Sequence, residues 1–192
     1  MIVVIIGIVL VAGVLLGCVV KEYNDLVVLK NRVENQGAQI DVQLKRRADL
    51  IPNMIETTKG YAHYEKETLS SITKLRTQIL STDNIETSYQ ASQRLGKITG
   101  QIIAVGEQYP DLKANTNFLQ LQQELSDTED RISKARQFYN DTVTKYNDAI
   151  MVFPNSMIAG IFGFHRISLL EVKESERETV KMDGGTFSGG LD

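Results

Sequence analysis

The chain has 192 residues, 42% of them hydrophobic, and its 21 basic and 24 acidic residues give a formal net charge of −3. This balance excludes a general electrostatic attraction to nucleic acid, so we expect no nucleic-acid partner. The single cysteine excludes both an internal disulfide framework and a cysteine-based zinc site.

The chain begins with an apolar segment, because residues 2–20 contain no charged or strongly polar side chain. A helix of about 20 apolar residues crosses the roughly 30 Å hydrocarbon core of a bilayer. We therefore predict a transmembrane anchor over residues 1–21, with residues 2–20 in contact with membrane lipid. No basic residue precedes Lys21, which argues against a cleaved signal peptide. The sequence Leu-Leu-Gly-Cys at residues 15–18 resembles a lipoprotein processing site. The absence of a preceding basic residue and the bulky Leu16 argue against lipidation of Cys18.

Basic residues flank this segment on one side only. Lys21, Lys30 and Arg32 follow it, whereas only the α-amino group precedes it. The positive-inside rule therefore predicts that the N-terminus lies outside and that the following domain lies in the cytoplasm. An extracytoplasmic domain is the alternative, because acidic residues such as Glu22 and Asp25 lie among these bases.

The stretch from residue 22 to about residue 80 has helical periodicity, because its apolar residues recur at steps of three and four. Pro52 interrupts this pattern, since proline lacks an amide proton and its ring clashes with the preceding turn. We expect a long helix over residues 22–80 that is kinked or broken at Pro52. The sequence does not decide between a kink and a reversal. The repeating apolar residues are Leu26, Leu29, Val33, Ile40, Leu44, Ile51, Ile55, Tyr61, Leu69, Ile72, Leu75 and Ile79.

Two more helices follow. Turn-forming residues at 81–84 predict that a second helix covers about residues 87–108. Tyr-Pro-Asp at 109–111 ends it, and Pro110 suits the first turn of a third helix over about residues 111–150. This third helix keeps a heptad pattern for more than four heptads, which favours packing within the chain and leaves an intermolecular coiled coil as the alternative. Its seam residues are Phe118, Leu121, Leu125, Thr128, Ile132, Ala135, Tyr139, Thr142, Tyr146 and Ala149.

The tripeptide Tyr-Asn-Asp occurs three times, beginning at Tyr23, Tyr139 and Tyr146. Because Tyr139 and Tyr146 are seven residues apart, both lie on one face of the third helix. A seam tyrosine offers a large apolar ring and a hydroxyl that can reach a polar partner. We interpret both tyrosines as structural residues, with convergence on a ligand as the alternative.

A second apolar segment, residues 153–165, is too short to span a bilayer. It could cap the bundle core, contact the membrane interface or bind a partner. Two of three ways of connecting the helices return it to the membrane side of the bundle. Residues 171–192 are polar and glycine-rich, and we expect a flexible tail. The candidate interaction residues are Phe153, Pro154, Asn155, Ile161, Phe162 and Phe164.

Few residues form a pattern that carries chemistry. His63 and Glu67 are four residues apart and could hold one edge of a metal site, but no third ligand has a recognisable spacing. The sequence contains no phosphate-binding loop, dinucleotide-binding glycine motif or nucleophile-elbow motif. We therefore expect no catalysis, no cofactor and no metal.

Lys45, Arg46 and Arg47 form a basic cluster between Asp41 and Asp49. The cluster could contact lipid headgroups, an acidic partner or acidic residues of the bundle. If the first helix is straight, Arg46 lies about 40 Å from the membrane end, far beyond a Debye length of roughly 8 Å. We therefore favour ion pairs within the bundle. The expected partners on the third helix are Glu124, Asp127, Glu129 and Asp130.

Three separated blocks of the chain resemble the LemA family. The first block is Ile-Asp-Val-Gln-Leu-Lys-Arg-Arg at residues 40–47, with its continuation to residue 62. The second is the heptad helix with its two Tyr-Asn pairs, and the third is Phe-Pro-Asn at 153–155 followed by Phe-Gly-Phe at 162–164. The residues that we assign to the structural motif are Asp41, Lys45, Arg46, Arg47, Asp49, Pro52, Asn53, Tyr139 and Tyr146.

The resemblance implies an all-α bacterial membrane protein: an N-terminal transmembrane helix followed by an elongated, up-and-down, four-helix-type antiparallel bundle over residues 22–170. It implies an uncleaved anchor in the cytoplasmic (inner) membrane, and some relatives are linked to organelle-like membrane compartments. It implies no particular reaction. We expect a scaffold or interaction protein that forms homo-oligomers. The alternatives are a binding module for another envelope protein or lipid through residues 153–164 and, more remotely, an enzyme accessory subunit.

Overall fold

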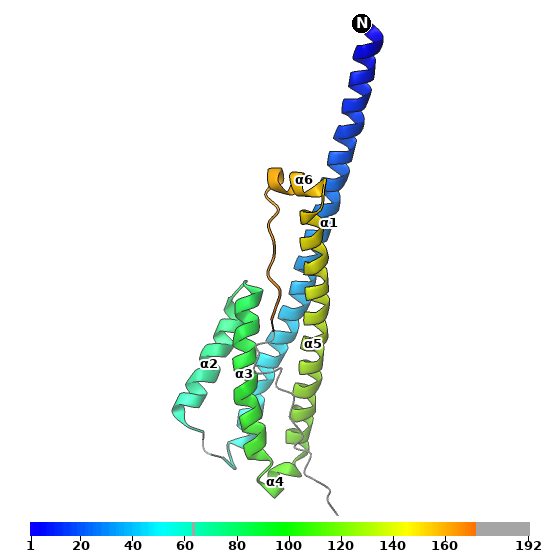
Figure 1. The fold of residues 1–192 in the computed structure, drawn as a ribbon. Coiled ribbons are helices and arrows are strands. Elements are labelled where there is room, and N and C mark those ends of the chain that lie inside the picture. Colours follow the sequence, from blue (N-terminus) through cyan, green and yellow to red (C-terminus); the bar gives the residue numbers. More distant parts are fainter. Residues whose placement is uncertain (63, 172–192) are drawn as a thin grey trace, which may run out of the picture.

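The computed structural model describes residues 1–62 and 64–171, and the regular elements of those residues are all helices (Figure 1). This confirms the all-α fold expected from the sequence. His63 and residues 172–192, which include nearly all of the expected tail, lie outside the described residues. The helices are α1 (Ile2–Thr58), α2 (Lys66–Ser81), α3 (Ile85–Gly106), α4 (Pro110–Lys113), α5 (Thr116–Met151) and α6 (Asn155–Phe162).

Helix α1 extends without interruption from the apolar segment into the bundle. It has 57 residues, which at 1.5 Å per residue corresponds to about 85 Å. Residues 2–20 project beyond the bundle (Figure 1). Their side chains are exposed, and this part is long and apolar enough to cross a membrane. The anchor predicted at residues 1–21 and the first bundle helix are therefore one rigid element.

The chain reverses at residues 59–65, beyond Pro52 rather than at it. Pro52 lies inside α1 and is exposed, while Ile51 and Met54 beside it are both 0% exposed. Burying two such side chains stabilises the helix by roughly 1.5–3 kcal/mol each. That gain offsets the approximately 3 kcal/mol that a proline costs in a helix interior, so the core contacts carry the helix past the proline.

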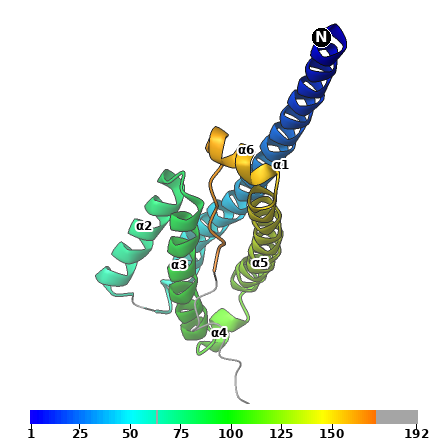
Figure 2. The same cartoon turned by 45° about the horizontal axis from the view of Figure 1, so that its top comes forward.

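Helices α1, α2, α3 and α5 run in alternating directions, which gives the expected up-and-down bundle (Figures 1 and 2). Asn84 and Asn115 cap α3 and α5, because each side-chain oxygen accepts a hydrogen bond from an amide of the first turn. Six of the ten seam residues of α5 are buried against the rest of the chain, and the other four are half-buried. The large side chains at the centre of the core include Leu26, Ile40, Leu44, Leu95, Phe118, Ile132, Val143 and Tyr146.

Arg47 joins three helices. Its Nη1 lies 2.7 Å from Glu129 Oε2 on α5 and donates a 3.5 Å hydrogen bond to Ser92 Oγ on α3. The guanidinium also lies against Gly96 of α3, where an added Cβ would be 2.0 Å from Nη2. The structure thus forms one of the ion pairs that the sequence predicted between the basic cluster and α5, and a glycine makes room for it.

Candidate functional site

Helix α6 lies across the end of the bundle from which the apolar part of α1 projects (Figures 1 and 2). The chain leaves α5 at Met151, and α6 begins at Asn155, directly after Pro154. The helix ends at Gly163, whose φ of +73° is one that residues with a side chain rarely adopt. The candidate segment therefore forms a short helix bounded by a proline and a glycine.

The large side chains of this segment are mostly exposed. Phe153 is 79% exposed, Ile161 75%, Met157 61% and Phe162 52%. Ile158 and Ala159 of α6 are both only 4% exposed and pack on the bundle. We call Phe153, Met157, Ile161 and Phe162 the apolar platform. A cluster of large exposed apolar side chains is typical of a surface that contacts a partner or a membrane.

Tyr23 of α1 connects the apolar platform to the apolar segment. Its ring centroid lies 4.7 Å from that of Phe162 and 5.8 Å from that of Phe164. Aromatic pairs at such distances contribute about 0.5–1.5 kcal/mol beyond their buried area. Because Tyr23 follows residues 2–20 within one helical turn, the platform lies at the end of the apolar segment. Residues 153–164 have thus returned to the side of the bundle from which α1 projects.

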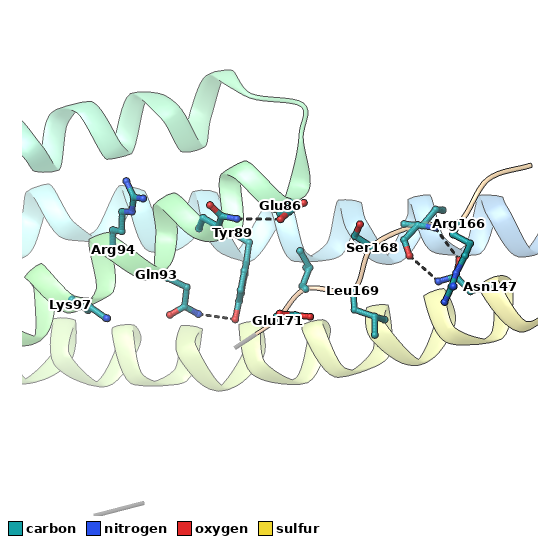
Figure 3. A pocket seen from close by; sticks show the side chains of 13 residues that line it. Glu86, Tyr89, Gln93, Arg94, Lys97, Asn147, Arg166, Ser168, Leu169 and Glu171 are labelled. Atoms are coloured by element: carbon teal, nitrogen blue, oxygen red, sulfur yellow. Dashed lines mark hydrogen bonds between the residues drawn. The ribbon is translucent and has the colours of Figure 1, made fainter. Parts of the chain in front are cut away.

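Residues 164–171, which we call the strap, follow α6 and lie beside α5 (Figures 1 and 3). Asn147 donates to the Ile167 carbonyl oxygen at 2.8 Å and accepts from the Ile167 amide at 3.0 Å. Asn140 makes the same pair of hydrogen bonds with Leu170, at 3.0 and 2.9 Å. Two side-chain amides therefore hold the strap through its backbone.

The two Tyr-Asn-Asp tripeptides of α5 place a buried tyrosine beside each of these asparagines. Tyr139 and Tyr146 are 4% and 1% exposed. Burial raises the pKa of both hydroxyls, and the Glu86 carboxylate adds to the rise in the pKa of Tyr139. The Tyr146 hydroxyl donates to the His165 carbonyl oxygen at 3.1 Å. The candidate residues chosen from the sequence include these tyrosines but not the asparagines that follow them. Asn140 and Asn147 are also seven residues apart, and this repeat is the signal that could have identified them.

The motif residues of α1 lie away from the platform. Lys45 donates to Asp41 at 2.7 Å, and this hydrogen bond and the charge of Asp41 raise the pKa of Lys45. Asp49 pairs with Arg76 of α2 at 3.0 Å. Arg46, Pro52 and Asn53 are exposed. These positions shape the first bundle helix and its contacts, and the structure does not bring them together with residues 153–164.

A groove of about 750 Å³ runs between α3 and the strap (Figure 3). Its lining is mixed in charge, with three basic and two acidic side chains. Among residues 1–62 and 64–171, no three His, Cys, Asp or Glu side chains gather as a metal ion would require. Glu67 lies in α2, and its suggested partner His63 is outside the described residues. The charged residues of the groove are Glu86, Arg94, Lys97, Arg166 and Glu171.

Comparison with known proteins gives the family. A sequence model described as LemA family matches residues 36–183. Protein LemA of Metamycoplasma hominis is 32% identical over 158 residues, a match that covers 82% of this chain and 72% of that protein. This chain belongs to the LemA family. The assignment confirms the resemblance seen in the three sequence blocks.

More distant relatives carry a different name. Magnetosome protein MamQ 2 of Paramagnetospirillum magneticum is 24% identical, and Magnetosome protein MamQ of Magnetospirillum gryphiswaldense is 23% identical. Each match covers 79% of this LemA family chain and spans 65% of the length of the MamQ protein. None of these names specifies a reaction.

Proposed function

We propose that this LemA family protein is a membrane-anchored helical scaffold of the bacterial cell envelope that assembles with copies of itself and has no catalytic activity. The observation that carries the proposal is the continuity of α1, because the apolar segment and the bundle share one 57-residue helix. A flexible linker would allow the bundle many orientations. One continuous helix instead gives the bundle a fixed direction relative to its anchor, which is what a scaffold requires.

The proposal includes a single-pass arrangement in the cytoplasmic (inner) membrane, with the N-terminus outside and the bundle in the cytoplasm. Lys21, Lys30 and Arg32 support this orientation, because cytoplasmic flanks of membrane spans are enriched in basic residues. Protease treatment of inside-out membrane vesicles tests it. We expect the bundle to be digested in those vesicles and protected in right-side-out vesicles, and the reverse pattern contradicts the orientation.

Two glycines of the apolar segment support self-assembly. Gly13 and Gly17 are four residues apart, and nothing lies within 4 Å of a Cβ built at either position. Small residues at this spacing allow two transmembrane helices to approach closely. Phe138 of α5, which is 62% exposed, offers a second surface for contact between bundles.

The assembly is tested by measuring the mass of the full chain in nanodiscs and by crosslinking it in native membranes. We expect a mass above that of one chain. The double substitution Gly13→Leu with Gly17→Leu is expected to shift the population towards monomer, whereas Gly7→Leu in the same segment is the matched control. A wild-type protein that is solely monomeric in both measurements refutes the self-assembling scaffold.

The apolar platform favours a second candidate function, in which residues 153–164 bind another membrane protein or lipid. Phe153 and Ile161 are the most exposed members of the platform. Replacing both with serine is expected to abolish recovery of a bound partner while leaving helicity unchanged. Leu119→Ser, at the other end of α5, is the control. Undiminished recovery by the double variant contradicts this function.

A further inference from the structure

The orientation of α6 relates the apolar platform to the membrane. Helix α6 lies crosswise to α1 at the end of the bundle from which residues 2–20 project (Figures 1 and 2), so it would run along the surface of a membrane that those residues cross. The inner face of α6, with Ile158 and Ala159, packs on the bundle. Met157 and Ile161 lie on the outer face, and that face is therefore directed to the side on which residues 2–20 extend.

We propose that α6 lies in the lipid–water interface of the membrane that α1 crosses, and that Asn140 and Asn147 fix it there by holding the strap. The inference rests on the proposed anchoring of the protein by residues 2–20. It assigns lipid as the occupant of the platform, and it assigns the two asparagines as positioning residues that contact the strap and not the lipid.

Continuity with the apolar segment favours lipid over a protein partner. The ring of Phe162 contacts Tyr23 at 4.7 Å, and Tyr23 lies within one turn of the end of the segment. This is the depth at which aromatic side chains concentrate in membrane proteins. Interfacial helices insert their apolar face by about 5–10 Å into the headgroup and acyl boundary, a depth that the exposed side chains of Phe153 and Ile161 can reach.

The spacing of the asparagines matches the spacing of the strap. The seven residues from Asn140 to Asn147 advance about 10.5 Å along α5. The three residues from Ile167 to Leu170 advance about 9–10 Å in an extended chain. A chain with three residues per turn also presents every third residue to the same side. In this register both backbone sites meet an asparagine at the same time.

An asparagine is suited to this task, because its amide carries a donor and an acceptor side by side. Asn147 and Asn140 each satisfy both the amide and the carbonyl group of one strap residue. The first end of α6 is tied to α5 through residues 152–154, and its second end is tied to α5 through the strap. Release of the strap would remove the connection at the second end and leave α6 held by residues 152–154 and by its packing on the bundle through Ile158 and Ala159.

Single tryptophans test the placement of α6, since the chain contains none. The full-length variants Leu10→Trp, Ile161→Trp and Leu119→Trp are placed in vesicles of phosphatidylcholine and of its brominated form, which quenches tryptophan inside the bilayer. Position 10 lies in the apolar segment and reports anchoring. Position 119, which is 47% exposed near the start of α5, reports the far end of the bundle.

We expect bromolipid to quench the emission at positions 10 and 161 by roughly half or more, as for side chains buried in the acyl boundary, and to leave position 119 unchanged. Quenching at position 10 but not at position 161 overturns the placement of α6 and leaves the anchor intact. Absence of quenching at position 10 overturns the proposed anchoring itself. Because the vesicles contain no other protein, quenching at 161 identifies lipid as the occupant.

The double substitution Asn140→Leu with Asn147→Leu in the Ile161→Trp protein tests the positioning role. We expect quenching at position 161 to fall about twofold. Amide exchange at Ile167 and Leu170 is expected to accelerate at least about tenfold, because the variant removes four hydrogen bonds to the strap. Asn117→Leu, at an exposed asparagine of the same helix, is expected to change neither.

Two results would overturn the positioning role. Accelerated exchange with unchanged quenching means that α6 holds its depth without the strap. Unchanged exchange means that the asparagines do not hold the strap. If the double variant loses helicity, Asn140→Leu alone gives the milder perturbation, and the same two readouts apply to it.

Discussion

Replacing Gly96 with alanine places a methyl group where the Arg47 guanidinium lies. The new Cβ would be 2.0 Å from Nη2 and 2.8 Å from Cζ, distances at which the arginine must move. Arg47 is a flexible side chain, so the cost comes mainly from its partners and not from the steric contact itself. Its side chain is only 12% exposed, and moving it separates Nη1 from Glu129 Oε2, now 2.7 Å apart.

The size of the effect follows from two opposing contributions. Loss of this ion pair costs about 2 kcal/mol, between the value for exposed pairs and that for buried ones, because the Glu129 side chain is 47% exposed. Alanine in place of glycine in a helix interior contributes about 1 kcal/mol of stability. We therefore expect Gly96→Ala to lower the free energy of unfolding by about 1 kcal/mol.

Gly100, one turn further along α3, is the matched control. Nothing lies within 4 Å of a Cβ built there, so Gly100→Ala is expected to stabilise the bundle by about 0.5–1 kcal/mol. The same gain is expected for Gly96→Ala in an Arg47→Met protein, whose shorter side chain does not reach the new methyl group. The two alanine substitutions in α3 are therefore expected to change the free energy of unfolding in opposite directions. The difference arises from Arg47 of α1, which lies against Gly96 only.

Chemical unfolding of the detergent-solubilised full chain, followed by circular dichroism at 222 nm, measures these differences. The double-mutant cycle of Arg47→Met and Gly96→Ala is expected to give a coupling of about 2 kcal/mol. If Gly96→Ala stabilises the protein as much as Gly100→Ala does, the ion pair does not hold the guanidinium in place and the reasoning is refuted.

Three further outcomes can be measured in the same way. Burial raises the pKa of Tyr139 and Tyr146 in the folded state, so these hydroxyls ionise first in the unfolded chain, near pH 10. The stability that they contribute is therefore fully present below that pH and falls as the pH rises further. A Tyr139→Phe and Tyr146→Phe protein that loses stability as steeply above pH 10 contradicts this. Gly106→Ala is expected to cost about 1–3 kcal/mol, because its Cβ would lie 2.7 Å from the Phe118 ring. Phe118→Ala is expected to cost about 3–5 kcal/mol and to make Gly106→Ala neutral or stabilising, and additive costs for these two changes would show that they do not share one space.

The heptad helix shows how much of this fold can be predicted from the sequence. Phe118, Leu125, Ile132, Tyr139 and Tyr146 recur at seven-residue intervals, and the structure buries all five in the core of the same chain. Such a pattern is informative because burial on one face of a helix imposes a period near 3.5 on the apolar residues. The all-α fold and the family resemblance, both predicted from repeated or contiguous residues, are confirmed.

Features that depend on single residues were harder to predict. Pro52 suggested the position of a kink or reversal, but the burial of Ile51 and Met54 decides locally that the helix continues. Helix propensity describes only the residue and its neighbours in sequence, so it does not include the stabilisation from burying these two side chains. The hydrogen bonds of Asn140 and Asn147 to the strap were not predicted for a related reason. Their partners are backbone groups, which every residue carries, so no residue type in the strap indicates them.

The unbroken helix α1 also makes the bundle a lever arm. Residues 21–58 extend about 57 Å beyond the apolar segment, so a 10° change in the tilt of the segment would displace the far end of the bundle by about 10 Å. Transmembrane helices change tilt by such amounts to match bilayer thickness. A protein built this way converts a small change in membrane thickness into a large displacement at the turn between α1 and α2. A crosswise α6 in contact with lipid would limit the tilt of α1 and therefore this displacement.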